Sequence, residues 1–161
     1  MTSMCYFADF GILNLWMLKF LWQYRVEFVM GSQSHVLVVS FPAQGHVAPL
    51  MKLSHQIADQ GIKVTFVSTE FIIARLTTTM PANSSIRLVS LPDGLEPGDN
   101  QIDTLKLINS FQETKPDHFK DLIEKINEST DDRIICVIAD VTVAWAFDVA
   151  EKMGIQSVAF W

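Results

Sequence analysis

The chain has 161 residues, of which 49% are hydrophobic and 19% are charged. This length can bury one hydrophobic core and this composition excludes an intrinsically disordered chain, so we expect a single folded domain. The formal net charge is −6 and Lys and Arg do not cluster, which excludes an electrostatic surface for nucleic acid.

Residues 1–29 differ in composition from the rest of the chain. They are rich in aromatic and aliphatic side chains, but charged residues interrupt them, and the longest uncharged stretch, 10–18, is far shorter than the ~18 apolar residues of a membrane span. The segment also lacks the basic start and cleavage site of a signal peptide. We expect an extension outside the fold, upstream of a polar lead-in at Met30. A membrane-surface anchor is the alternative, weakened because no clean apolar helical face is present.

From residue 35 onward the pattern is typical of alternating strands and helices. The valine-rich run 36–39 predicts a strand covered on both faces, as in a parallel sheet. After a loop at 40–45, apolar residues at helical spacing predict a helix that ends at Gly61. Pro49 is expected in the first turn of this helix, where its missing N–H costs nothing.

The same alternation continues to the last residue. Further strands are predicted at 64–67, 86–89, 134–139 and 157–161, and further helices at 70–76, 102–111, 119–126 and 142–153. Pro116 separates the two middle helices, Gly154 ends the last one, and a Gly/Pro/Asp-rich segment at 91–100 predicts an exposed loop. The predicted fold class is α/β, a Rossmann-like parallel sheet flanked by helices and spanning residues 30–161.

Cysteine and histidine spacing gives no sign of a metal. Cys5 and Cys136 lie far apart, and Cys136 falls inside an apolar run, where we expect a small buried hydrophobic side chain. None of the four histidines forms a metal-binding pair, and we expect no metal or cofactor. The loop 41–45 contains one glycine, so it is neither a dinucleotide fingerprint nor a P-loop.

Two polar residues lie where an open parallel sheet binds its ligands, at the carboxyl ends of strands. His46 follows the first predicted strand at the mouth of a helix, and Asp140 follows the fourth. The helix dipole favours a neutral imidazole at this place, and a carboxylate on the other ring nitrogen would orient it as a base. Spacing alone leaves the alternative that both are solvated capping residues. We likewise expect solvated residues without a catalytic role at His35, His55 and His118.

The sequence resembles the plant family 1 UDP-dependent glycosyltransferases. The likeness lies in HVLVVSFPAQGHVAPLMKLSHQIADQG at 35–61, VTFVSTEF at 64–71, SLPDGL at 90–95 and VIADVTVAWAFDVAEKMGIQSVAFW at 137–161. By this resemblance the fold is the N-terminal half of a two-domain enzyme of GT-B type. The family transfers a sugar, commonly glucose, from a UDP-sugar to a hydroxyl of a small lipophilic acceptor such as a flavonoid, with inversion.

The resemblance also implies residue roles. His46 falls on the catalytic base and Asp140 on its supporting carboxylate, whereas Phe41, Gly45, Thr142 and Trp145 fall on positions that contact acceptor or donor sugar. The UDP-sugar is a co-substrate, and the cytosolic plant type is implied.

The family's donor-binding signature is missing from this sequence. We therefore expect a domain truncated after the fifth strand and inactive by itself, which binds a UDP-sugar only with a second domain. The rival interpretations are a non-enzymatic module that binds small lipophiles or another chain, and an unstable pseudogene product.

Overall fold

The computed structural model describes residues 5–6, 34–81, 84–92, 115–128 and 132–160. Its centre is a six-stranded sheet, in which every strand pairs in parallel with its neighbours, in the order β1-β6-β5-β2-β3-β4. The strands are β1 (Cys5–Tyr6), β2 (His35–Val39), β3 (Lys63–Thr69), β4 (Ile86–Leu91), β5 (Ile134–Asp140) and β6 (Gln156–Phe160). The five strands expected from residue 35 onward are confirmed.

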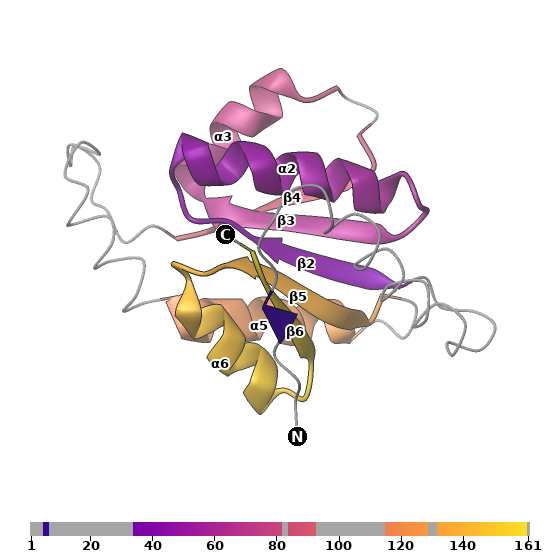
Figure 1. Cartoon of the computed structure of the whole chain (residues 1–161), viewed down its shortest axis with the longest axis vertical. Coiled ribbons are helices and arrows are strands. Elements are labelled where there is room, and N and C mark those ends of the chain that lie inside the picture. The colour runs from indigo at the N-terminus through magenta and orange to yellow at the C-terminus, as the bar shows by residue number, and fades with distance from the viewer. Residues whose placement is uncertain (1–4, 7–33, 82–83, 93–114, 129–131, 161) are drawn as a thin grey trace.

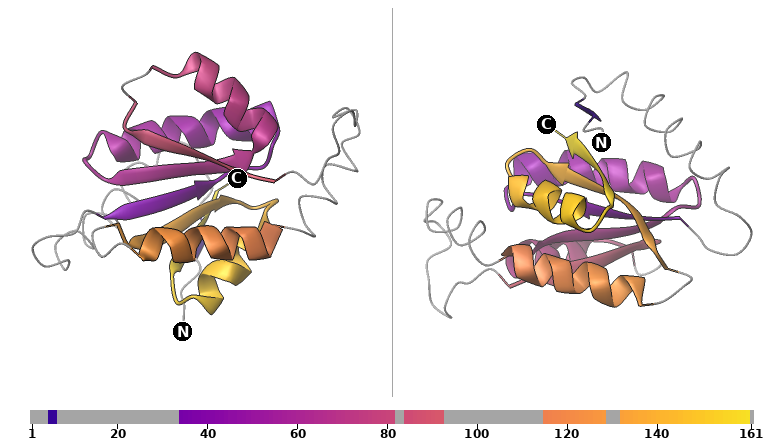
Figure 2. Two further views of the ribbon diagram at one scale, coloured as in Figure 1. Left: turned by 180° about the vertical axis from the view of Figure 1, so that it is seen from behind. Right: turned by 90° about the horizontal axis from the view of Figure 1, so that it is seen from below.

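Helices cover both faces of this sheet (Figures 1 and 2). Helices α2 (Gln44–Ala58) and α3 (Glu70–Thr79) pack on one face, and α5 (Lys115–Asn127) and α6 (Ala144–Lys152) pack on the other. Successive strand residues alternate between the two resulting cores: Val36 and Val38 face α2, whereas Leu37 and Val39 face α5 and α6. The Rossmann-like α/β prediction is therefore confirmed.

The two glycines predicted to end helices and the predicted buried cysteine are also confirmed. Gly61 and Gly154 adopt φ angles of 76° and 68°, the left-handed conformation that glycine allows after a helix. Cys136 is 2% exposed within the core between the sheet and α2, and burial raises the pKa of its thiol to about 12.

The first helix begins earlier than the sequence predicts. Ala43 is its N-cap, in extended conformation, and α2 starts at Gln44, so Pro49 lies in the second turn. The expectation that Pro49 occupies the first turn was wrong. Because proline has no N–H, the carbonyl of Gly45 receives no amide from position 49. Packing of Val47, Leu50 and Leu53 into the core holds the helix despite that missing bond.

The last helix begins later than predicted, at Ala144, because residues 140–143 form a turn. The amide of Val143 donates to the carbonyl of Asp140 at 2.9 Å, and the amide of Thr142 donates to the Asp140 side chain at 2.9 Å. This turn carries the chain from β5 to the N-cap at Val143, and the helix begins at the next residue, Ala144.

Two sequence predictions fall wholly or mostly outside the described residues. The helix expected at 102–111 is one of them, and the loop expected at 91–100 is described only at Leu91, the buried end of β4, and Pro92. The helix expected at 119–126 is confirmed as α5, which starts at Lys115 with Pro116 in its first turn.

The segment 1–29 contributes one described element. Cys5 and Tyr6 form β1, which pairs in parallel with Val158 and Ala159 at the edge of the sheet. No strand is predicted at these two residues from their sequence pattern. The remainder of the segment lies outside the described residues, so its position outside the fold stays a prediction.

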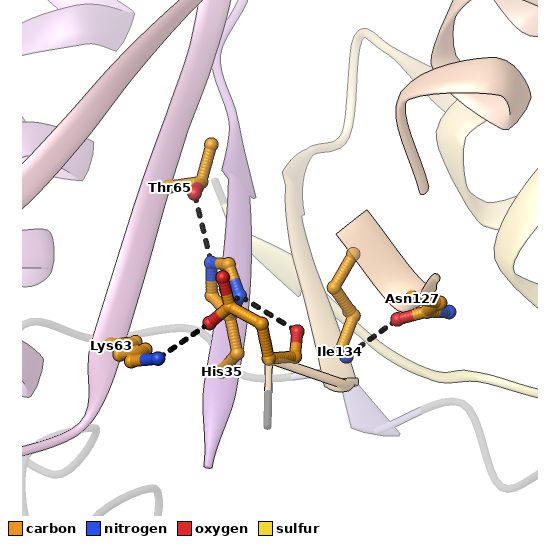
Figure 3. A network of polar contacts seen from close by, with 6 residues as sticks. His35, Lys63, Thr65, Asn127 and Ile134 are labelled. Carbon is orange, nitrogen blue, oxygen red and sulfur yellow. Dashed lines mark hydrogen bonds and ion pairs between the residues drawn. The ribbon is translucent and has the colours of Figure 1, made fainter. Parts of the chain in front are cut away.

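His35 occupies a buried polar network where the strands begin (Figure 3). It is 2% exposed, so its assignment as a solvated residue was wrong. Its Nδ1 lies 3.2 Å from the carbonyl oxygen of Asp132, an acceptor, and its Nε2 lies 2.8 Å from the hydroxyl of Thr65. A neutral ring satisfies both contacts by donating from Nδ1 and accepting at Nε2. His55 and His118, in contrast, are exposed as expected.

Burial dominates the charge state of this network. It lowers the pKa of His35 below the ordinary 6.5, an effect that the nearby Asp132 only partly opposes. The Asp132 carboxylate instead pairs with Lys63, whose Nζ lies 2.8 Å from Oδ1, and this bond lowers the pKa of Asp132. The 3.4 Å contact between His35 and the same carboxylate is therefore made by a neutral ring.

Candidate active site

The strand order reverses between β2 and β5, and the carboxyl ends of these two strands are called the crevice of the sheet below. From β2 the chain moves outward through β3 and β4, then returns to the other side of β2 to add β5 and β6. Adjacent parallel strands whose connections leave in opposite directions diverge at their carboxyl ends, where open α/β sheets bind ligands. Val39 at the end of β2 pairs with Ala139, so the loop that leads to His46 starts beside Asp140.

His46 and Asp140 form a direct hydrogen bond across this crevice. Nδ1 of His46 lies 2.6 Å from Oδ2 of Asp140, although 94 positions separate the two residues. The His46 side chain is 40% exposed, whereas that of Asp140 is 3% exposed. A buried carboxylate therefore orients an imidazole that solvent can reach.

The buried Asp140 carboxylate is held by the turn that follows it. The main-chain amide and the hydroxyl of Thr142 both lie near Oδ1, at 2.9 and 2.6 Å, which leaves Oδ2 for His46. The amide of Val141 donates to the carbonyl of Phe160 at the end of β6. A buried carboxylate needs such donors because it has lost its water.

Two buried serines hold the loop between β2 and α2. The Ser40 amide donates to the carbonyl of Val67, and the hydroxyls of Ser40 and Ser68 donate to the carbonyls of Phe41 and Ser40. Both serines are fully buried. Sequence reasoning missed them, although a serine directly after a buried strand was an available signal.

The predicted binding residues fall into three environments. Phe41 lies beside His46, with ring centroids 5.3 Å apart and planes at 64°, and Thr142 bonds to Asp140. Gly45 is exposed in the first turn of α2, and a Cβ built on it would meet nothing within 4 Å. Trp145 belongs to the core: it is 8% exposed and packs edge-on against Phe119, with centroids 5.4 Å apart.

This arrangement fixes which nitrogen of His46 can act as a base. An ionised carboxylate only accepts hydrogen bonds, so Nδ1 carries the proton of a neutral ring and Nε2 keeps its lone pair. In the described part of the chain, Nε2 has no hydrogen-bond partner. The pair can therefore accept a proton from a bound hydroxyl and stabilise the resulting imidazolium.

The described ranges contain neither a metal-binding group nor a membrane-spanning helix. Their histidine, cysteine and acidic side chains nowhere gather in groups of three or more that could hold a metal ion. Their helices are all too short or too polar to cross a bilayer.

Known proteins match both the sequence and the fold. The family model described as "Glycosyltransferase, N-terminal domain" matches residues 32–91. UDP-glycosyltransferase 83A1 of Arabidopsis thaliana is 41% identical over 137 residues, covering 78% of this chain and 29% of that protein. The (R)-mandelonitrile beta-glucosyltransferase of Prunus dulcis is 35% identical over 135 residues, covering 79% of this chain and 28% of the relative.

Solved structures share the fold. Arabidopsis thaliana UGT89C1, crystallised with UDP-L-rhamnose, superposes with a TM-score of 0.67 at 22% identity over 81% of this chain and 36% of that one. The same enzyme has been crystallised with quercetin, and that structure gives a TM-score of 0.63.

The fold, the histidine–aspartate pair at its crevice and these similarities together define the chain as a glycosyltransferase domain. It belongs to the plant UDP-glycosyltransferase family. The chain spans less than a third of the length of the curated relatives it matches, 29% of UDP-glycosyltransferase 83A1 and 28% of the Prunus dulcis enzyme.

Proposed function

We propose that this chain supplies the acceptor side and the catalytic base of an enzyme that transfers a sugar, commonly glucose, from a UDP-sugar to a hydroxyl of a small lipophilic acceptor. The observation that carries this proposal is the 2.6 Å bond between Nδ1 of His46 and Oδ2 of Asp140 at the crevice of a family domain. A flavonoid or another phenol is the acceptor class we favour, and the cytosol is the compartment.

In the proposed reaction, Nε2 of His46 takes the proton of the acceptor hydroxyl as its oxygen attacks the anomeric carbon. The bond from that carbon to the phosphate oxygen breaks, and UDP leaves with the electron pair, so the configuration inverts. A phenol with a pKa near ~10 needs this help at neutral pH. A general base contributes about 10²- to 10⁴-fold, or about 3 to 5 kcal/mol of barrier.

Asp140 and four neighbouring positions complete the proposed site. Asp140 holds the Nδ1–H tautomer and stabilises the imidazolium that forms. The proposed contacts to the acceptor or the donor sugar are Phe41, Gly45, Thr142 and Trp145. Of these four residues, Trp145 lies in the core.

Transfer by these residues also needs a domain that binds the UDP-sugar. We propose that the chain alone is nearly inactive, because an unbound donor is not oriented against the acceptor and the site stays open to water.

The test is UDP-glucose transfer to a panel of phenols, measured for the chain alone and for the chain fused to the donor-binding domain of a related enzyme. Each form is made with His46 intact and as His46→Ala, with His55→Ala, on the exposed side of α2, as the matched control. We expect turnover only in fusions that retain His46. Turnover by the His46→Ala fusion would remove the base assignment, and turnover by the chain alone would show that no second domain is needed.

A binding module without chemistry is the second candidate. A cavity of about 360 Å³ lies between α2 and α3, within the ~300–1,000 Å³ range of small-molecule sites, and most of its floor is apolar. The apolar residues that line this cavity are Val47, Ala48, Met51, Ile72 and Leu76, and its polar lining residues are Gln44, Arg75, Thr78 and Thr79. Acceptor binding that Met51→Trp blocks, with no transfer by any fusion, would favour this candidate.

A further inference from the structure

We propose that Thr142 is a positioning residue for the His46–Asp140 pair, in addition to any contact it makes with substrate. This inference rests on the proposed function, since it concerns how the base is held ready. Its evidence is a set of three hydrogen bonds that converge on one buried carboxylate.

The two carboxylate oxygens of Asp140 have different hydrogen-bond partners. Thr142 donates twice to Oδ1 of Asp140, from its main-chain amide at 2.9 Å and its hydroxyl at 2.6 Å, and His46 donates to Oδ2 at 2.6 Å. Rotation of the carboxylate would break all three bonds together. Thr142 therefore fixes the direction in which Oδ2 faces His46.

Burial of the Asp140 carboxylate makes each of its hydrogen-bond donors matter. The Asp140 side chain is only 3% exposed, so water cannot replace a lost donor at little cost. Hydrogen bonds from a hydroxyl to an ionised carboxylate are short and strong, as the 2.6 Å distance from Oγ1 to Oδ1 is. Removing this hydroxyl leaves Oδ1 with the amide alone and frees the carboxylate to turn.

The tautomer of the His46 imidazole depends on the direction of this carboxylate. The Nδ1–H tautomer of His46 is held by Oδ2, and only this tautomer leaves Nε2 able to accept a proton. A carboxylate that turns away releases the ring to the opposite tautomer, which carries its proton on Nε2. The side chain of Thr142 thus acts on the base through Asp140.

The hydroxyl geometry also limits what Thr142 can do for a ligand. Its single proton is committed to Oδ1, so Oγ1 can only accept a hydrogen bond from a substrate hydroxyl. Such a contact would polarise the Thr142 hydroxyl further toward Asp140.

The test compares Thr142→Val, which removes the hydroxyl at nearly constant shape, with Thr142→Ser, which keeps it. The control is Thr77→Val, because Thr77 is also an exposed threonine whose hydroxyl is bonded, there to the carbonyl of Ile73 in α3. The first readout is the tautomer of His46 from imidazole ¹⁵N chemical shifts in the 161-residue chain, which requires no enzymatic activity.

We expect the Nε2–H form to become populated in Thr142→Val and to stay at the wild-type level in Thr142→Ser and Thr77→Val. In the donor-domain fusion, we expect Thr142→Val to lower kcat about 10-fold with little change in acceptor KM, and Thr142→Ser to restore it. An unchanged tautomer in a folded Thr142→Val chain, or a rise in KM at constant kcat, would overturn the proposal. A tautomer shift in a protein whose fusion shows no transfer would uphold the positioning role while contradicting the proposed function.

Discussion

Two histidines lie at opposite ends of β2, and their surroundings differ in almost every respect. His35, where the strand begins, is 2% exposed, and both of its ring nitrogens contact protein atoms. His46, in the helix that follows the strand, has a side chain 40% exposed, and of its two ring nitrogens only Nδ1 is hydrogen-bonded within the described residues.

The partners explain the difference. His35 faces a carbonyl and a hydroxyl, which a neutral ring satisfies without charge, and burial lowers its pKa. His46 faces a buried carboxylate whose other oxygen takes two hydrogen bonds from Thr142, and this carboxylate holds only Nδ1 of the ring. A histidine joined to protein on both sides serves the fold, whereas one held on a single side by a buried charge remains available for proton transfer.

The largest expected effect is on catalysis, from His46→Gln. Glutamine keeps an amide that can donate to Asp140 but cannot take a proton from the acceptor. We expect sugar transfer by the donor-domain fusion to fall by about 10²- to 10⁴-fold while the unfolding midpoint in urea stays near that of the wild type. If the His46→Gln fusion kept sugar transfer within a few-fold of the wild type, His46 would not be the base, and the functional contrast with His35 would be lost.

A second substitution addresses the other end of the strand. His35→Leu removes the partner of the Thr65 hydroxyl and of the Asp132 carbonyl, and a buried polar group left unpaired costs about 1–3 kcal/mol. We expect the free energy of unfolding, measured in urea, to fall by that amount. His55→Ala, on the exposed side of α2, serves as the control and should change it by less than about 0.5 kcal/mol. If His35→Leu and His55→Ala lowered the free energy of unfolding equally, the His35 network would not stabilise the fold.

The pH dependence of stability should carry a contribution from the His35 network. Because the pKa of folded His35 is lowered, the unfolded chain binds this proton first as pH falls below 6.5, and stability contributed by neutral His35 is lost from there downward. Asp132, whose pKa is also lowered, adds a loss of the same sign below 3.8.

We therefore expect a lower urea midpoint at pH 5.0 than at pH 7.5. The difference should be smaller in His35→Gln, which cannot titrate. A difference of the wild-type size in this variant would assign the acid sensitivity to other groups.

The smallest expected effect on stability comes from Gly45→Ala, beside His46. A Cβ at this helical position meets nothing within 4 Å, and alanine favours a helix by roughly 0.5–1 kcal/mol over glycine. We expect the thermal midpoint to hold or rise slightly while transfer by the fusion falls, because the methyl group would occupy space that the proposed substrate contact needs. Unchanged transfer would remove Gly45 from the site.

The comparison of the two ends of β2 also shows where sequence reasoning succeeds. Valine-rich runs that alternate with amphipathic stretches predicted the five strands from residue 35 onward and the Rossmann-like fold, because hydrophobic periodicity is local information. The same reasoning set Pro49 in the wrong turn and started the last helix at Thr142 instead of Ala144, because hydrophobic spacing shows which residues face the core but not the residue at which a helix begins.

The sequence by itself determined the fold class and, through resemblance, the family. It also identified His46 and Asp140 as candidates, since each follows a predicted strand. Only the tertiary structure decided that their side chains meet at 2.6 Å, that Thr142 holds the carboxylate and that Trp145 lies in the core. It also decided that His35 is buried and His46 accessible. The physical reason is that strand order and crossover direction set which distant residues become neighbours, and neighbours determine burial, tautomer and charge.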